Sequence, residues 1–157
     1  GGQIFITNGL LENLSTEDEA AGVLAHEIGH VVGRHSAEHL AKARLTEGLG
    51  GAAVIASYDP ENPSSVQTGQ IAMVIGQLVN LKFGREDELE SDFLGVCFMN
   101  EAGYDPQAML RVMEVLASAG EGQARPPEFF STHPNPENRI AEIQAAIANL
   151  DQCPQSN

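Results

Sequence analysis

One five-residue motif constrains this chain more than any other feature: His26-Glu27-Ile28-Gly29-His30. The residues around it keep helical spacing, so the motif is predicted to lie inside a helix with an apolar stripe made of Ala20, Val23, Leu24, Ile28 and Val31. Residues four apart on a helix differ by about 40° in direction and about 6 Å in height. The imidazoles of His26 and His30 can therefore reach one metal ion.

Glu27 lies about 100° around the predicted helix from His26, beside the metal. From there its carboxylate can hold a water bound to zinc and take its proton, as the base of a zinc peptidase does. Chance would give about one or two such motifs per hundred shuffled sequences of this composition, and it would not favour an apolar helix. We interpret the motif as a zinc site with Glu27 as the catalytic base.

A catalytic zinc takes a third protein ligand and keeps one position open for water. The metzincin pattern H-E-x-x-H-x-x-G-x-x-H requires a histidine at position 36, but this chain has Ser36 there, and His35 comes one residue early. One residue turns a helical side chain by about 100°, so that class is rejected. We interpret His35 and His39 as structural or exposed, and expect the third ligand elsewhere.

The acid-rich start of a helix predicted over residues 85–102 is the expected source of that ligand. Glu88 and Asp92 share one face of this helix, and Glu86 with Glu90 forms a rival pair on another face. The rest of the helix is apolar and predicted to be buried, so a carboxylate on it needs a compensating charge. Zinc would supply that charge to Glu88, and Asp92 could accept a hydrogen bond from a ligand histidine. Spacing alone does not decide between the two pairs.

Composition excludes several classes of partner. Hydrophobic residues make up 42% of the 157 residues, which is typical of one soluble globular domain. The formal charge of −14 disfavours nucleic acid and acidic membrane surfaces, and no run of 18 apolar residues predicts a transmembrane segment. One catalytic domain is expected over residues 1–150, cut from a longer precursor, with a disordered tail over 151–157. Whether Cys97 and Cys153 pair is left open.

The predicted fold class is α+β and mostly helical, with a small N-terminal β element at residues 4–7 and a turn at Asn8-Gly9. A capping box over residues 16–19 begins the helix that carries the motif. This helix is predicted to run to about Leu45, and the glycines of residues 48–51 interrupt it. The remaining predicted elements are helices over 52–58, 66–83, 85–102, 106–120 and 136–150, and a Gly/Pro-rich loop over 121–134.

Four motifs, in this order, resemble those of one zinc metallopeptidase family, the HtpX, Oma and BepA type, a gluzincin family related to the CAAX prenyl proteases. They are Gly-Gly-x-Ile-Phe-Ile-Thr-Asn-Gly-Leu-Leu at 1–11, Leu-Ala-His-Glu-Ile-Gly-His at 24–30 with Arg-His-Ser at 34–36, Glu-Leu-Glu-Ser-Asp at 88–92 with Ala-Gly-Tyr-Asp-Pro at 102–106, and Ser-Thr-His-Pro at 131–134 with Arg-Ile at 139–140. The resemblance covers nearly the whole chain and implies a zincin-like catalytic domain.

The resemblance also implies a set of roles for the site. It implies one Zn2+ per chain with three protein ligands, His26, His30 and Glu88. It implies that Asp92 is the hydrogen-bonding partner behind a ligand histidine, and that His133 donates a hydrogen bond to the oxyanion of the tetrahedral intermediate. Arg139 is expected to anchor the loop that carries His133.

The function expected from these features is a zinc-dependent metalloendopeptidase that acts on unfolded or extended protein segments. We hypothesise that such a protein or peptide substrate pairs with residues 4–7 as an added strand. The resemblance to the soluble bacterial branch favours an extracytoplasmic location, periplasmic or envelope-associated. The alternatives are a binding or chaperone-like module and a hydrolase of another bond type; Glu27 argues against the first, because a structural zinc needs no adjacent base. The sequence leaves the physiological substrate and the oligomeric state open.

Overall fold

The computed structural model describes residues 2–62, 65–120, 133 and 138–154. Within this described part the chain forms six α-helices, one 3-10 helix and no strand. The chain divides into two compact units: unit 1 comprises Gly1–Gly33 with Arg85–Asn157, and unit 2 comprises Arg34–Gly84. The sequence predicted one domain over residues 1–150 and gave no sign of this division into two units.

The two units differ in charge. Four of the 8 cationic residues and four of the 22 acidic residues of the chain lie in unit 2, so its formal charge is zero. Unit 1 holds the other four cationic and eighteen acidic residues. The whole formal charge of −14 therefore falls on unit 1.

Unit 1 begins with an irregular segment and a short helix instead of the predicted strand. Residues 2–7 lie outside any helix or strand, and α1 (Asn8–Leu11) follows, with the Thr7 hydroxyl accepting a hydrogen bond from the Leu10 amide at 3.2 Å. A strand persists only where its backbone groups pair with a neighbouring strand, and the described residues offer none. The predicted β element at residues 4–7 and the α+β class are therefore wrong for the described part of the chain.

The helix that carries the motif is α2 (Glu17–Val32), and it begins at the predicted capping box. Thr16 Oγ1 accepts a hydrogen bond from the Glu19 amide at 3.2 Å, and Glu19 Oε2 accepts one from the Ser15 amide at 2.6 Å. The first amides of a helix lack partners within the helix, so these bonds stabilise its start. The prediction of this helix start is confirmed.

The end of α2 differs from the prediction. The helix ends at Gly33 instead of near Leu45, because Arg34 has a left-handed backbone (φ 59°) that stops the ladder of hydrogen bonds. The next helix, α3 (His35–Ser57), begins directly after Arg34 and continues through residues 48–51. Each glycine there costs a helix only roughly 1 kcal/mol, which does not suffice to end it.

A single long helix, α4 (Ser65–Ala102), replaces the two helices predicted over 66–83 and 85–102. Its second part, from Arg85 onward, belongs to unit 1. The helix ends at Gly103, whose left-handed backbone (φ 82°) is the conformation that glycine adopts most readily after a helix.

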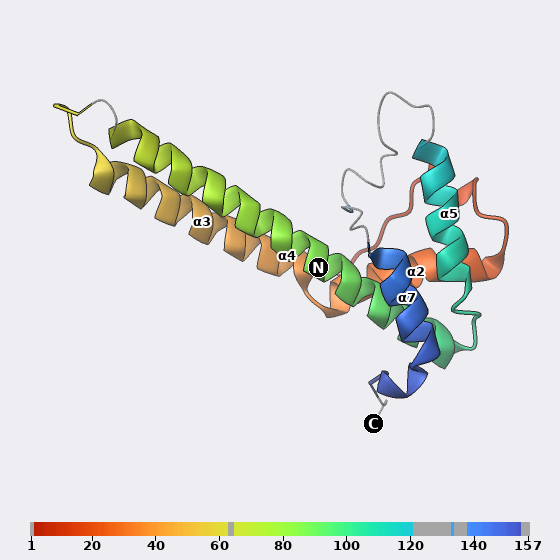
Figure 1. Cartoon of the computed structure of the whole chain (residues 1–157). Helices are drawn as coiled ribbons and strands as arrows, with labels where there is room; N and C mark the ends of the chain where they lie inside the picture. Colours follow the sequence, from red (N-terminus) through yellow and green to blue (C-terminus); the bar gives the residue numbers. More distant parts are fainter. Residues whose placement is uncertain (1, 63–64, 121–132, 134–137, 155–157) are drawn as a thin grey trace. The chain divides into compact units, whose positions relative to one another are not determined.

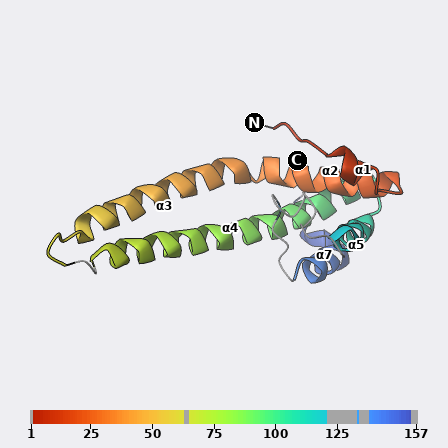
Figure 2. The ribbon, with the colours of Figure 1, turned by 90° about the horizontal axis from the view of Figure 1, so that it is seen from above.

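The core of unit 1 is built by α2, the second part of α4, α5 (Ala108–Gly120) and α7 (Arg139–Ala148). Both α2 and α7 pack against α5, as two views of the ribbon show (Figures 1 and 2). The buried apolar side chains of this core include Ala25, Val96, Met99, Ala108, Met109 and Ile143. α5 and α7 lie within the helices predicted over 106–120 and 136–150. The loop predicted over 121–134 lies outside the described residues, except for His133.

A disulfide ties the C-terminal end of unit 1 to α4. Cys97 of α4 is bonded to Cys153, with their Cα atoms 5.5 Å apart and a sequence separation of 56 residues. The 3-10 helix η1 (Leu150–Gln152) lies directly before Cys153. The prediction of a disordered tail is therefore wrong for residues 151–154, and residues 155–157 lie outside the described part.

Unit 2 is a helical hairpin in which α3 and the first part of α4 run side by side in opposite directions (Figures 1 and 2). Gly50 is buried, whereas Leu45, Leu49 and Ile55 are 63%, 63% and 79% exposed. Across the described residues, no helix has both the length and the apolar composition needed to span a membrane.

Candidate metal centre

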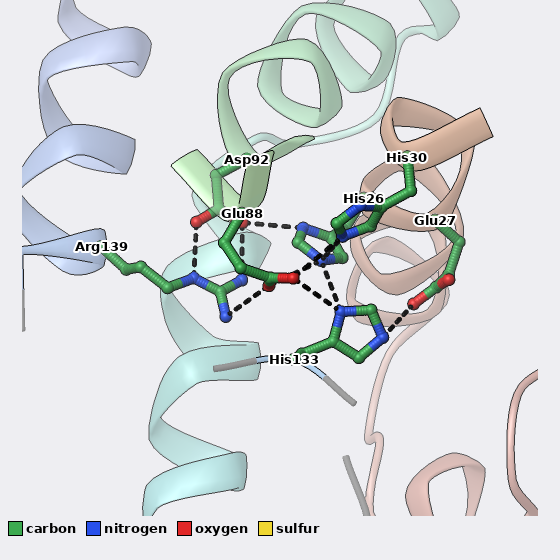
Figure 3. Close-up of polar contacts among 7 residues, drawn as sticks. All are labelled: His26, Glu27, His30, Glu88, Asp92, His133 and Arg139. Carbon is green, nitrogen blue, oxygen red and sulfur yellow. Dashed lines mark hydrogen bonds and ion pairs between the residues drawn. The ribbon is translucent and has the colours of Figure 1, made fainter. Parts of the chain in front are cut away.

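Seven side chains that the sequence singles out converge in unit 1 (Figure 3). They are His26, Glu27 and His30 from α2, Glu88 and Asp92 from α4, His133, and Arg139 from α7. The two histidines of α2 and the two acids of α4 are each four residues apart, so each pair projects from one side of its helix. Three helices that are distant in sequence therefore meet at one point.

Four of these residues face a common point: His26, His30, Glu88 and His133 each offer a donor atom within 4.8 Å of the others. His26 Nε2 lies 3.1 Å from His30 Nε2 and 3.4 Å from His133 Nδ1. Glu88 Oε1 lies 3.2 Å from His30 Nε2 and 3.1 Å from His133 Nδ1. Donor atoms held at about 2.0–2.1 Å by one tetrahedral zinc are separated by about 3.3–3.4 Å. The cluster thus has the size and the donor set of a tetrahedral metal site, and a metal ion fits it.

Asp92 and Arg139 support this cluster from behind. Asp92 Oδ1 accepts a hydrogen bond from His26 Nδ1 at 2.9 Å, so Nε2 is the ring nitrogen that faces the other three donors. Arg139 donates from Nε and Nη2 to the two carboxylate oxygens of Asp92, both at 2.7 Å, and its Nη1 lies 3.2 Å from Glu88 Oε2. Both side chains are about 1% exposed. Charge-assisted bonds with this geometry are short and strong, so they orient the ligands.

These contacts change the protonation of the cluster in the absence of metal. Burial alone would raise the pKa of Glu88, but hydrogen bonds from His133, His26 and His30 outweigh it and hold that pKa far below its usual range. Burial alone would lower the pKa of His26, but its bonds to Asp92 and Glu88 raise the pKa to about 9. Burial lowers the pKa of His30. A metal ion that enters at neutral pH must therefore displace a proton from His26.

Glu27 lies beside the four donors and is not one of them. Its Oε1 is 3.3 Å from His133 Nε2, the ring nitrogen opposite the one that faces the cluster. The Glu27 side chain is 17% exposed, while that of Glu88 is 3% exposed. Glu27 therefore stands next to the candidate metal position and keeps access to water.

The structure separates the two acidic pairs that spacing left open. Glu88 and Asp92 are buried and face the histidines, whereas Glu86 and Glu90 are exposed. His35, which the sequence excluded as a ligand, is buried in unit 2.

His133 and Arg139 have contacts that the sequence did not predict. His133 was expected to be a hydrogen-bond donor to the oxyanion and not a ligand, yet its Nδ1 lies 3.4 Å from His26 Nε2 and 3.1 Å from Glu88 Oε1. It is 45 residues away from Glu88 in sequence, so no local spacing could have indicated this. Arg139 was expected to hold the loop of His133, whereas its contacts in the described residues are with Asp92 and Glu88.

Comparisons with known proteins find similarity to proteases over most of the chain. A family model described as "Peptidase family M48" matches residues 1–147. The chain is 33% identical over 149 residues to the "Beta-barrel assembly-enhancing protease" of Escherichia coli, an alignment that covers 92% of this chain and 30% of that protein. It is 36% identical over 144 residues to the "Mitochondrial metalloendopeptidase OMA1" of Schizosaccharomyces pombe, covering 92% and 41%.

The protein of the same name from Saccharomyces cerevisiae is 31% identical over 156 residues, covering 97% of this chain and 43% of the relative. The chain thus spans less than half the length of each of these relatives. No solved structure matches the chain.

Proposed function

The chain belongs to peptidase family M48, and from this premise we propose that it is a zinc-dependent metalloendopeptidase that hydrolyses peptide bonds in unfolded or extended protein segments. The observation that supports this most directly is the cluster of four donor atoms, in which neighbouring donors lie 3.1–3.4 Å apart, with a partly exposed carboxylate beside it. His26, His30 and Glu88 are the proposed zinc ligands, and Glu27 is the proposed base.

The residues of the chain would divide the reaction among them. Bound zinc supplies a Lewis acid that polarises the scissile carbonyl and acidifies the attacking water. Glu27 takes the proton of that water and returns it to the leaving amine. Asp92 and Arg139 hold the His26 imidazole in the orientation that turns Nε2 toward the proposed zinc position. The short distances among these side chains support this division of roles.

In this scheme His133 could be a metal ligand or a hydrogen-bond donor to the oxyanion. Its place among the other donors supports the first role in the absence of substrate. A catalytic zinc has three protein ligands and an open position, whereas four donors meet here. We infer that His133 would be a fourth ligand of the metal in the absence of substrate and would give up this place to the substrate. In the displaced position its ring can donate a hydrogen bond to the developing oxyanion.

The proposed preference for unfolded substrates follows from the position of the proposed base. Glu27 and His133 are only 17% and 14% exposed at their side chains, so a peptide bond must enter a confined site to reach them. Bonds inside a compact domain cannot do so, whereas an extended segment can. The proposed partner is therefore protein or peptide in extended form.

We propose an extracytoplasmic location on the basis of the disulfide. Disulfides such as Cys97–Cys153 persist in oxidising compartments and are rare in the bacterial cytosol. One relative is named for β-barrel assembly and another for mitochondria, so the relatives do not select one compartment.

The Glu27→Gln variant tests the proposed function. It is expected to bind one zinc per chain and to keep its helical content, but to lose most cleavage of an unfolded protein such as casein, because the water loses its base. Zinc content by elemental analysis and casein cleavage are measured on the same samples. A Glu27→Gln variant that cleaves casein at a near-normal rate would show that Glu27 is not the base. A wild-type protein that binds zinc but cleaves nothing would favour a binding or chaperone-like module.

A further inference from the structure

The backbones of α2 and α4 approach each other closely beside the proposed metal ligands. A Cβ atom built on Gly29 would lie 2.9 Å from both Cα and the carbonyl oxygen of Ser91, and 3.2 Å from Ser91 Cβ. Real Cβ atoms essentially never approach other atoms within 3.0 Å. Ser91 is fully buried, so it has no free space into which to retreat. Only glycine fits at this position of α2.

A second contact of the same kind lies nearby, with the roles of the helices exchanged. A Cβ atom on Gly95 of α4 would lie 3.2 Å from the backbone nitrogen of His26 and 3.4 Å from the backbone carbon of Ala25. It would also lie 3.2 Å from Met109 Cε, which is the end of a flexible side chain. A glycine from each helix therefore touches the backbone of the other helix.

The positions of these contacts relate them to the metal ligands. Gly29 lies between His26 and His30 in sequence, and Ser91 lies between Glu88 and Asp92. Gly95 touches the backbone of His26 itself. The two glycine contacts thus lie among the residues whose spacing decides whether the donor atoms can share one ion.

We propose that Gly29 and Gly95 are positioning residues for the metal centre: they set the separation of α2 and α4 at which His26, His30 and Glu88 reach one ion. This inference rests on the proposed metal site. An ordinary contact begins at 3.4 Å, so an alanine at position 29 would push the Ser91 backbone away by about 0.5 Å. Distances from a metal to its ligands tolerate changes of only about 0.2 Å. The displacement therefore exceeds what the site can absorb.

Gly22 provides a matched control on the same helix, seven residues before Gly29. It is also buried, but a Cβ atom there would lie 3.4 Å from Met109 Cγ and 3.6 Å from Met99 Sδ, and the nearest backbone atom, Met109 Cα, would be 3.8 Å away. These are ordinary contact distances. An alanine at position 22 is therefore expected to leave the separation of α2 and α4 unchanged.

The test compares Gly22→Ala, Gly95→Ala and Gly29→Ala with the wild type. Zinc affinity is measured by competition with a chelator, the geometry of the site by the absorption spectrum of bound Co2+, and the metal-free fold by circular dichroism. We expect Gly22→Ala to bind zinc like the wild type, Gly29→Ala to bind about 10–100-fold more weakly or worse, and Gly95→Ala to fall between them. The Co2+ spectrum of Gly29→Ala and Gly95→Ala should change, while the metal-free helical content stays the same.

The outcomes distinguish this inference from the proposed function. Wild-type zinc affinity and an unchanged Co2+ spectrum in Gly29→Ala overturn the inference alone. If Gly29→Ala does not fold, the decision rests on Gly95→Ala: weaker zinc binding with normal metal-free helical content supports the inference, and normal zinc binding overturns it. A wild-type protein that takes up no stoichiometric zinc overturns the proposed function instead.

Discussion

Asp92 links two other residues of the candidate site, His26 and Arg139. Its carboxylate accepts hydrogen bonds from His26 and from two nitrogens of Arg139. All three side chains are buried, so removing one of them leaves its partner without a hydrogen bond. An unsatisfied buried polar group costs about 1–3 kcal/mol, and a charged group costs more. The orientation of His26 therefore depends on Arg139, although the two side chains need not touch.

Replacing Glu88 by Ala is expected to lower zinc affinity by more than about 100-fold, and replacing Asp92 by Asn by about 10–100-fold. The first change removes a donor atom, whereas the second keeps the shape of the side chain and removes its charge. Competition with a chelator measures both. Glu86→Ala, on the exposed side of the same helix, is the control and should bind zinc normally. Loss of zinc in Glu86→Ala with normal binding in Glu88→Ala would reverse the ligand assignment.

Replacing His133 by Ala is expected to leave zinc bound, because three donors remain on the two helices α2 and α4. The spectrum of bound Co2+ should show one nitrogen donor fewer than in the wild type. Casein cleavage by the same variant tests the second role of His133: a fall in kcat of about 10²–10³ is expected for loss of an oxyanion donor. An unchanged Co2+ spectrum would contradict the proposed place of His133 among the metal ligands.

Much of the site could be predicted from local sequence, because most of its residues act in pairs four apart on a helix. This spacing brings His26 to His30 and Glu88 to Asp92 in any helix. What spacing could not decide was which acidic pair faces inward, since that depends on how α4 packs in unit 1. The position of His133 beside Glu88 depends on a contact across 45 residues, which no periodicity describes.

At the scale of elements, the disulfide is the only covalent link between α4 and the end of the chain within the described residues. It closes a loop with a sequence separation of 56 residues that includes His133 and Arg139. A crosslink of this length restricts the unfolded chain and is typically worth about 2–4 kcal/mol.

Replacing Cys153 by Ser is therefore expected to lower the free energy of unfolding by about 2–4 kcal/mol. Urea unfolding of the metal-free protein, followed by circular dichroism, measures this difference. Adding a reductant should destabilise the wild type by a similar amount and leave Cys153→Ser unaffected. Equal unfolding midpoints for the oxidised and reduced wild type would show that the pair contributes nothing.

Helix positions were predictable where the sequence marks a boundary chemically. The Thr16 cap and Gly103 mark the start of α2 and the end of α4, and both were predicted. The break at Arg34 was not predicted, because a positive φ is uncommon for arginine and nothing in the local sequence indicates it. The glycines of residues 48–51 predicted a break where α3 continues, because helix propensity is a weak preference that packing overrides.

At the scale of the whole molecule, the mostly helical character was predictable, and the division into two units was not. Apolar periodicity identifies helices one at a time, and it does not show which helices share a core. The residues 4–7 have strand-forming side chains, but a strand also needs a pairing partner, and the described residues contain none. Pairing of a substrate with residues 4–7 stays a prediction.

The uneven charge of the two units has a consequence for kinetics. Unit 1 combines the candidate site with the entire formal charge of −14, so its electric field acts on any charged molecule that diffuses toward the site. Such a field accelerates the encounter with cations and slows the encounter with anions. Salt weakens it, because the Debye length falls from about 30 Å at 0.01 M to about 10 Å at 0.1 M ionic strength.

Peptides that differ only in the charge of residues flanking the cleaved bond should therefore respond differently to salt. For a lysine-flanked peptide, kcat/KM is expected to fall as sodium chloride is raised, and for a glutamate-flanked peptide it is expected to rise. A serine-flanked peptide is the control and should change little. The same slope for all three peptides would mean that the field of unit 1 does not steer substrates. If the slopes differ as expected, unit 1 selects substrates by their charge before any of them reaches the metal.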